Sequence, residues 1–165
     1  MTVVGARIDN RLLHGMVATN WAPQSGATRV MVIDDKVALD PVLKETMKMG
    51  RPAGMAVSII TLSKAINNFS TGKYDNQKVF IVSKTPEVFL ELQEKGVSLP
   101  ELVLGGTLTP ENTDGFIQAS KRAYVSKNQI ATYKKLLSNG TLIKVMYTPN
   151  DREVKLTDVF STNKV

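Results

Sequence analysis

The sequence contains no cysteine and only one histidine among its 165 residues. The absence of cysteine excludes disulfides, thiol nucleophiles, iron–sulfur ligation and every zinc site that uses a thiolate. One imidazole, that of His14, cannot build a multi-histidine metal site, and histidine is the only residue type that normally titrates near neutrality. Any step that needs an imidazole must therefore use His14. No metal and no cofactor is expected.

Long apolar runs and nucleotide-binding glycine motifs are missing as well. No stretch approaches the ~20 apolar residues of a membrane-spanning helix, and Arg7 and Asp9 interrupt the apolar start, unlike a secretory signal. A soluble, cytoplasmic protein is expected. The motifs G-x-G-x-x-G, G-x-x-x-x-G-K-[ST] and G-x-S-x-G do not occur. Dinucleotide-binding, P-loop and α/β serine hydrolase sites therefore have no support.

What the chain does contain is a sizeable apolar fraction and an excess of positive charge. Hydrophobic residues make up 42% of it, and 21 Lys and Arg against 15 Asp and Glu give a net charge of +6. This length and composition predict one folded domain, residues 1–165. The positive charge favours anionic partners such as phosphate groups, acidic proteins or the inner membrane face, and a well-solvated surface explains it equally well.

Short apolar runs alternate with stretches of helical period along the whole chain. Near-continuous apolar strands indicate burial on both faces, which is typical of a parallel sheet covered by helices. We predict an α/β fold with three layers, α/β/α, and a mainly parallel central sheet. The predicted strands are Thr2–Ile8, Arg29–Ile33, Ala56–Thr61, Lys78–Val82, Glu101–Leu104, Lys121–Val125 and Leu142–Tyr147, and the predicted helices are His14–Gln24, Pro41–Gly50, Leu62–Phe69, Pro86–Lys95 and Lys127–Ser138.

Capping residues support these helix boundaries, and Thr107–Gly115 is predicted to be a surface loop. At two expected helix starts an oxygen-bearing residue precedes a proline, and at a third a Ser precedes a Gln by three residues, which is the spacing of a capping box. Glycines follow the last helical turns, where a residue in the left-handed conformation is usually needed. The expected N-caps are Asp40, Thr85 and Ser126, and the expected terminal glycines are Gly50, Gly96 and Gly140.

The segment from Arg7 to Gly15, RIDNRLLHG, brings two arginines, an aspartate and the single histidine close together in the sequence. It follows the first strand, at the edge of a parallel sheet where ligands bind. A neutral imidazole can attack phosphorus, Arg11 can offer a planar fork of donors to phosphate, and Asp9 can fix the tautomer of His14 or pair with an arginine. A structural role for the histidine, or a surface ion pair between Asp9 and Arg11, remains an alternative.

The longer segment RIDNRLLHGMVATNW, which ends at Trp21, resembles the R-I-D-D-R-L-I-H-G-Q-V…W signature of one protein family. That family comprises the IIB subunits of the mannose/fructose/sorbose class of the bacterial phosphoenolpyruvate-dependent sugar phosphotransferase system. The similarity continues in Asp34-Asp35, in the Ser83–Glu87 turn and in Gly105-Gly106.

The resemblance implies a soluble phosphocarrier that works at the inner face of the membrane. A IIA protein would donate a phosphoryl group to His14, and a sugar held by the membrane subunits IIC and IID would receive it. It further implies that Arg11 and Asp9 stabilise the phosphoryl group, with support from Arg7, which could equally form a structural ion pair. A homo-oligomer is left open, and no nucleic acid is expected.

Two positions depart from the family signature. Asn10 replaces its second acid, which removes a negative charge near the phosphoryl group, and Met16 replaces a common Gln. The asparagine is similar to that of members serving N-acetylgalactosamine, although mannose, fructose and sorbose stay open because sugar choice belongs to the membrane subunits.

Other residues have both a structural and a functional interpretation. Ser83 and Thr85 could reach the phosphoryl group from the same edge, and Thr85 could also cap a helix. Trp21 is expected to pack in the core, and Asp34-Asp35 to mark a helix entry or partner contact rather than a magnesium site. Gly105-Gly106 could turn the chain or cradle an anion.

Two other functions are weighed against the phosphocarrier. A small nucleotide- or nucleic-acid-binding module would use the basic surface, but only ten aromatic residues are present and no basic stripe carries them. A histidine-dependent phosphoryl-transferring hydrolase would need a second acid or a metal that the sequence does not reveal.

Overall fold

The computed structural model describes residues 2–165, with only the backbone of Thr2; Met1, which the predicted domain includes, lies outside the described residues. A mostly parallel seven-stranded sheet in the order β3-β2-β4-β1-β5-β8-β9 forms its centre, and only β9 runs antiparallel to its neighbour. The strands are β1 (Thr2–Asp9), β2 (Arg29–Ile33), β3 (Ala56–Ile60), β4 (Lys78–Ser83), β5 (Glu101–Gly106), β8 (Leu142–Val145) and β9 (Val154–Lys155).

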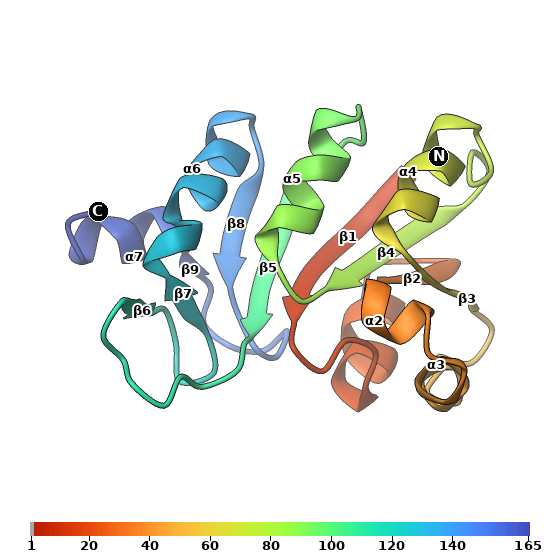
Figure 1. Cartoon of the computed structure of the whole chain (residues 1–165), viewed down its shortest axis with the longest axis horizontal. Coiled ribbons are helices and arrows are strands. Elements are labelled where there is room, and N and C mark those ends of the chain that lie inside the picture. Colours follow the sequence, from red (N-terminus) through yellow and green to blue (C-terminus); the bar gives the residue numbers. More distant parts are fainter. Residues whose placement is uncertain (1) are drawn as a thin grey trace.

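Helices cover both faces of this sheet, as predicted for a three-layer fold. On one face, seen in front in Figure 1, lie α4 (Leu62–Ser70), α5 (Pro86–Glu94) and α6 (Ile130–Ser138), and α7 (Leu156–Thr162) contributes to the same apolar cluster. A second cluster lies under the π-helical turn η1 (Val17–Trp21), α1 (Ala22–Gln24), α2 (Asp35–Ala38) and α3 (Pro41–Lys48). Within residues 2–165, no helix is long and apolar enough to cross a membrane.

Most predicted strands agree with the sheet to within two residues, but Lys121–Val125 is wrong as a strand of it. This region forms β7 (Tyr124–Ser126), which pairs antiparallel with β6 (Phe116–Gln118) in a separate small sheet. Ala119 and Ser120 both donate their N–H to the carbonyl of Ala123, so the chain turns tightly there. A short hairpin with exposed cations at its turn replaces the buried parallel strand.

The capping predictions are only partly confirmed. The carboxylate of Asp40 accepts hydrogen bonds from Val42 N–H and Leu43 N–H, and Ser126 Oγ accepts one from Asn128 N–H. Thr85 occupies the N-cap position of α5, but its side chain makes no capping hydrogen bond. Gly50 is not among the glycines with positive φ, whereas Gly96 and Gly140 are.

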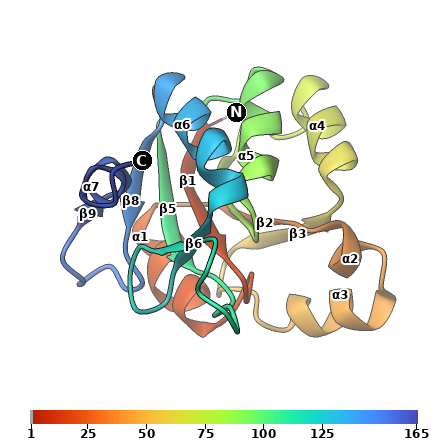
Figure 2. The same cartoon turned by 60° about the vertical axis from the view of Figure 1, so that its left-hand side comes forward.

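The carboxyl ends of the parallel strands share one edge, and this edge collects the irregular parts of the chain. In Figures 1 and 2 the η1 turn, the pair α2 and α3, and the β6–β7 region all lie at the lower end of the sheet, where the arrows of β1, β5 and β8 point. The segment from Arg7 to His14 begins in β1 and emerges at this edge.

Candidate functional site

The site begins with the last residues of β1, whose alternation sends neighbouring side chains to opposite faces. Ile8 packs into the cluster under α4, α5 and α6. Arg7 and Asp9, two residues apart, therefore share the other face, and Arg7 Nε donates a hydrogen bond to Asp9 Oδ2 at 3.0 Å. Both side chains are buried, at 0% and 1% exposed.

A tight turn then brings the histidine back over this ion pair. Leu12 N–H donates to the Asp9 carbonyl, and Leu12 adopts a φ of +57°, which is uncommon for a residue other than glycine. Leu12 and Leu13 are buried in the second apolar cluster, which offsets the conformational cost of roughly 1–3 kcal/mol. Their burial anchors the turn so that His14 points back toward Asp9.

His14 and Arg7 meet on the same carboxylate oxygen. His14 Nε2 lies 2.9 Å from Asp9 Oδ2, and the histidine side chain is 8% exposed. The second oxygen, Asp9 Oδ1, accepts the Arg11 backbone N–H at 2.9 Å. An ionised carboxylate can only accept, so Nε2 of the neutral ring carries the hydrogen and Nδ1 keeps a free lone pair.

The charges of this group support that assignment. Burial alone raises the pKa of the Asp9 carboxyl, but the hydrogen bonds from His14 and from Arg11 N–H, together with the Arg7 charge, outweigh it and hold that pKa below its ordinary value. Burial lowers the pKa of Arg7, which Asp9 opposes. Asp9 is therefore ionised at neutral pH.

Arg7 is held by residues that the sequence pattern does not connect with it. Its Nη1 and Nη2 donate to the carbonyls of Met146 and Tyr147, directly after β8. Its guanidinium also lies 4.9 Å from the ring centre of Trp21 and 5.7 Å from that of Tyr147. The two carbonyls bond to Arg7 instead of continuing β8, which ends earlier than predicted, at Val145.

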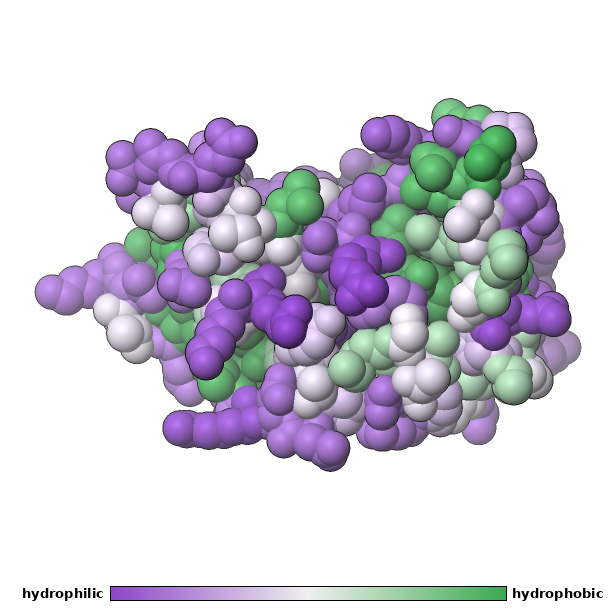
Figure 3. Space-filling view, turned by 90° about the horizontal axis from the view of Figure 1, so that it is seen from below, coloured by the Kyte–Doolittle hydropathy of each residue, from purple (hydrophilic) through white to green (hydrophobic). Residues whose placement is uncertain are grey.

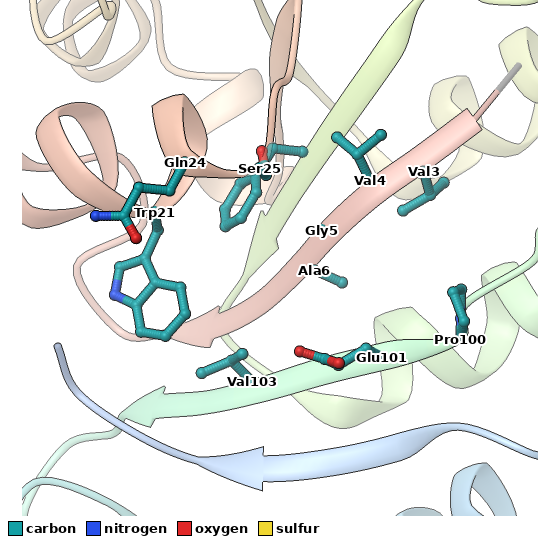
Figure 4. A pocket seen from close by; sticks show the side chains of 11 residues that line it. Val3, Val4, Gly5, Ala6, Trp21, Gln24, Ser25, Pro100, Glu101 and Val103 are labelled. Atoms are coloured by element: carbon teal, nitrogen blue, oxygen red, sulfur yellow. The ribbon is translucent and has the colours of Figure 1, made fainter. Parts of the chain in front are cut away.

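Trp21 packs partly buried against the second cluster, as expected, and it also reaches the site. The predicted helix His14–Gln24 widens into a π-helical turn at Val17–Trp21, where Ala22 N–H donates to the Val17 carbonyl. Trp21 Nε1 donates to the Tyr147 carbonyl at 2.9 Å. In Figure 4 the indole stands over β1 beside Val103 of β5, at the edge of a groove of about 420 Å³.

Gly105 provides the space for the buried guanidinium. Gly105 and Gly106 are the last residues of β5 rather than a turn, and the register between β1 and β5 shifts there. A Cβ on Gly105 would overlap the guanidinium of Arg7. The glycine pair can be seen in the sequence, but the need for a glycine at position 105 comes from Arg7, almost one hundred positions away.

The remaining predicted residues are distributed around the site. Arg11 is exposed, and its Nη1 lies 3.5 Å from the Tyr147 hydroxyl; together with Asn10 it lines a cavity of about 410 Å³ that also contains the cations of Lys121 and Arg122. Thr85 and Asn10 line a second cavity, of about 540 Å³. The buried Ser83 hydroxyl donates to the Ile33 carbonyl.

The acidic pair Asp34-Asp35 marks a helix entry, as expected. Asp34 caps α2 by accepting the Val37 N–H and lies 3.5 Å from Lys84 Nζ, while Asp35 accepts the Leu62 N–H. Figure 3, which views this edge of the molecule from below, shows hydrophilic side chains across the middle and apolar patches toward the side of α2 and α3. Exposed apolar residues on those helices are Val42 and Leu43, with Leu39 and Met49 beside them.

Comparison with known proteins gives consistent results. The family model described as the PTS system sorbose subfamily IIB component matches residues 3–165. The chain is 36% identical over 154 residues to the N-acetylgalactosamine-specific phosphotransferase enzyme IIB component 2 of Escherichia coli K12, covering 93% of this chain and 96% of that protein. It is 31% identical over 160 residues to the mannose-specific EIIAB component of the same strain, covering 96% of this chain but only 49% of that protein.

A solved structure agrees over nearly the whole chain. The IIBSor domain of the sorbose permease from Klebsiella pneumoniae superimposes with a TM-score of 0.90 at 27% identity, covering 98% of both chains. The α/β architecture, including the mostly parallel sheet, is therefore shared with that domain.

The contact between Gly105 and Arg7 predicts the effect of one added methyl group. Gly105→Ala should lower the free energy of unfolding in urea by about 3 kcal/mol, because overpacking must displace a buried guanidinium. Gly15→Ala is the matched control, since its added Cβ would meet no atom within 4 Å beyond its chain neighbours and its own helix backbone, and the position is helical. It should be neutral or stabilising by up to about 1 kcal/mol. Equal losses in both variants would contradict this account.

The lowered pKa of Asp9 predicts a pH-dependent stability. Because the folded-state pKa lies below the unfolded value of about 3.9, the stabilisation is complete above that value and is lost as pH falls through the folded pKa. Asp9→Asn leaves Arg7 buried without its partner, at a cost of about 3–5 kcal/mol near neutrality.

Urea unfolding at several pH values measures this difference between the native protein and Asp9→Asn. We expect the gap between them to narrow as pH falls below about 4. Asp114→Asn, at an exposed position, should track the native protein at every pH. A gap that stays constant into acid would show that Asp9 does not titrate in this way.

Proposed function

Because the chain belongs to the sorbose subfamily of IIB components, phosphotransferase components of the phosphoenolpyruvate-dependent sugar phosphotransferase system, we propose that His14 is the residue that carries the phosphoryl group. It accepts the group from a IIA domain and passes it to a sugar held by the membrane subunits IIC and IID. The observation that carries this proposal is the hydrogen bond between His14 Nε2 and the buried, ionised Asp9.

That hydrogen bond determines which nitrogen reacts. With Nε2–H bound to Asp9, the Nδ1 lone pair attacks the phosphorus of the donor's phosphohistidine. The new bond from Nδ1 to phosphorus forms as the donor's nitrogen–phosphorus bond breaks, and the bonding electrons return to the donor imidazole. The ring of His14 becomes positively charged, and the carboxylate of Asp9 stabilises that charge through Nε2–H.

The other predicted residues have different parts in this proposal. Arg11 offers its guanidinium to the phosphoryl oxygens from the cavity it shares with Lys121 and Arg122, and Asn10 adds an amide there. Arg7 supports the phosphoryl group through Asp9, because its three guanidinium nitrogens are all hydrogen-bonded within the protein. Thr85 is a rim contact, whereas the Ser83 hydroxyl is already committed to Ile33.

The IIA partner is supported by the mannose-specific relative, whose name combines A and B components and of which this chain matches about half. The sugar is left open among mannose, fructose, sorbose and an amino sugar, since the sugars named for the relatives differ. Contact with IIC and IID would hold the protein at the cytoplasmic face of the membrane. This proposal is favoured over a nucleotide- or nucleic-acid-binding module by family membership.

Phosphorylation tests the role of His14 directly. With phosphoenolpyruvate, the general carrier proteins and a cognate IIA, the protein should gain one phosphoryl group that is labile in acid and stable in alkali, as measured by intact mass. His14→Ala should gain none, because no other imidazole is present. A variant that is still phosphorylated would end the proposal.

The role of Arg11 is tested by keeping its charge and changing its shape. Arg11→Lys should slow phosphoryl transfer by roughly tenfold while changing unfolding stability by less than about 0.5 kcal/mol, since an exposed lysine offers a point charge rather than a planar fork. Lys121→Arg, at the same cavity, is the matched control and should leave the rate within about twofold. Rapid-quench phosphorylation measures the rates, and parallel loss of rate and folding in Arg11→Lys would contradict the assignment.

A further inference from the structure

The guanidinium of Arg7 is enclosed by groups that come from four separate parts of the chain. Its own strand supplies Asp9, the segment after β8 supplies the carbonyls of Met146 and Tyr147, and β5 supplies the Gly105 backbone. Two aromatic rings complete the enclosure, Trp21 at 4.9 Å and Tyr147 at 5.7 Å from the guanidinium carbon.

These two aromatic residues are also fixed to each other. Trp21 Nε1 donates to the carbonyl of Tyr147, the same oxygen that accepts Arg7 Nη2. Asp151 accepts the Tyr147 N–H, and the guanidinium of Arg122 stacks on the Tyr147 ring at 4.1 Å. Trp21 and Tyr147 therefore form a rigid aromatic clamp on Arg7.

Arg7 Nε and the Arg11 backbone N–H each hold one oxygen of Asp9, and the oxygen bound to Arg7 is the one that meets His14. Asp9 Oδ2 is shared between Arg7 Nε at 3.0 Å and His14 Nε2 at 2.9 Å. A guanidinium free to tilt would draw this carboxylate away from the imidazole, and the hydrogen on the ring would then distribute between Nε2 and Nδ1. A hydrogen bond to one ring nitrogen is what selects the tautomer in proteins.

We propose that Trp21 and Tyr147 are positioning residues that hold His14 in its Nε2–H tautomer by immobilising Arg7. Neither residue contacts the imidazole by a hydrogen bond, and both act through Arg7 and Asp9. The Tyr147 hydroxyl also lies 3.5 Å from Arg11 Nη1, and Tyr147→Phe removes that contact separately. The effect on transfer rate rests on the proposed function of His14, whereas the tautomer of the unphosphorylated protein does not.

The single histidine makes the tautomer directly measurable. In protein labelled with ¹⁵N-histidine, one pair of ring-nitrogen signals reports which nitrogen carries the hydrogen, without assignment of any other residue. The native protein at a pH where the ring is neutral should show a hydrogen on Nε2 and none on Nδ1. The variants to compare are Trp21→Leu, Tyr147→Leu, Trp21→Phe and Tyr147→Phe.

The expected results distinguish the effect of the aromatic rings from that of the tyrosine hydroxyl and the indole N–H. Both leucine variants should give averaged signals that indicate a mixture of tautomers, and both should be phosphorylated about tenfold more slowly. Both phenylalanine variants keep a ring over or beside the guanidinium and should retain the Nε2–H tautomer. Tyr147 is only partly buried, so Tyr147→Leu leaves the core intact and decides the matter even if Trp21→Leu folds poorly.

Tyr74→Leu is the matched control. Tyr74 also stacks on an arginine, Arg29, at 5.4 Å, and it is buried in the apolar cluster on the other face of the sheet. It should lower stability without changing the histidine signals. An unchanged Nε2–H tautomer in Tyr147→Leu overturns the proposal, and so does an equal mixture in Tyr74→Leu. A native protein with the Nε2–H tautomer that no IIA phosphorylates would instead refute the proposed function alone.

Discussion

The buried ion pair between Arg7 and Asp9 is the interaction on which the site depends. Removing two charges from water costs several kcal/mol per ion, and their attraction repays that cost only when the remaining hydrogen-bonding groups are satisfied. Here the guanidinium binds two backbone carbonyls and the carboxylate binds a backbone N–H and an imidazole. Among the described side chains, those of residues 3–165, no buried nitrogen or oxygen lacks a partner. The pair thus joins β1, the turn to His14 and the segment after β8.

In the proposed function, this arrangement gives each nitrogen of the imidazole a separate task. Nε2 is held in place by its hydrogen bond to Asp9, and the ionised carboxylate of Asp9 would stabilise positive charge on the ring. The other nitrogen has no hydrogen-bond partner among the described residues and is the one available for chemistry. The proposed carrier role needs a ring that gains and loses positive charge without changing its position. Asp9 suits this role because Arg7 and the Arg11 backbone N–H hold its carboxylate and its pKa lies below the ordinary value.

The sequence was sufficient for the parallel sheet and for the residues of β1 that form the site. Apolar strands such as Arg29–Ile33 are buried on both faces, so local pattern and tertiary environment agree. Lys121–Val125 has a similar strand pattern but lies in a hairpin, because a short segment of sequence does not show which strand it pairs with. The clamp by Tyr147 and the need for Gly105 were missed since both arise from contacts across more than ninety residues, and the π-helical turn at Trp21 departs from α-helical spacing.

The strand period explains why one short segment can serve both the core and the site. In β1 and the turn after it, Ile8 and then Leu12 and Leu13 enter apolar clusters, which fixes the backbone on either side of Asp9. Arg7 and Asp9 occupy the alternate positions, so they meet on one face without any loop to order. Arg11 is exposed and lines the cavity together with Asn10. The apolar residues thus anchor the backbone, and the alternate residues supply the buried charges that hold the histidine, whose side chain is 8% exposed.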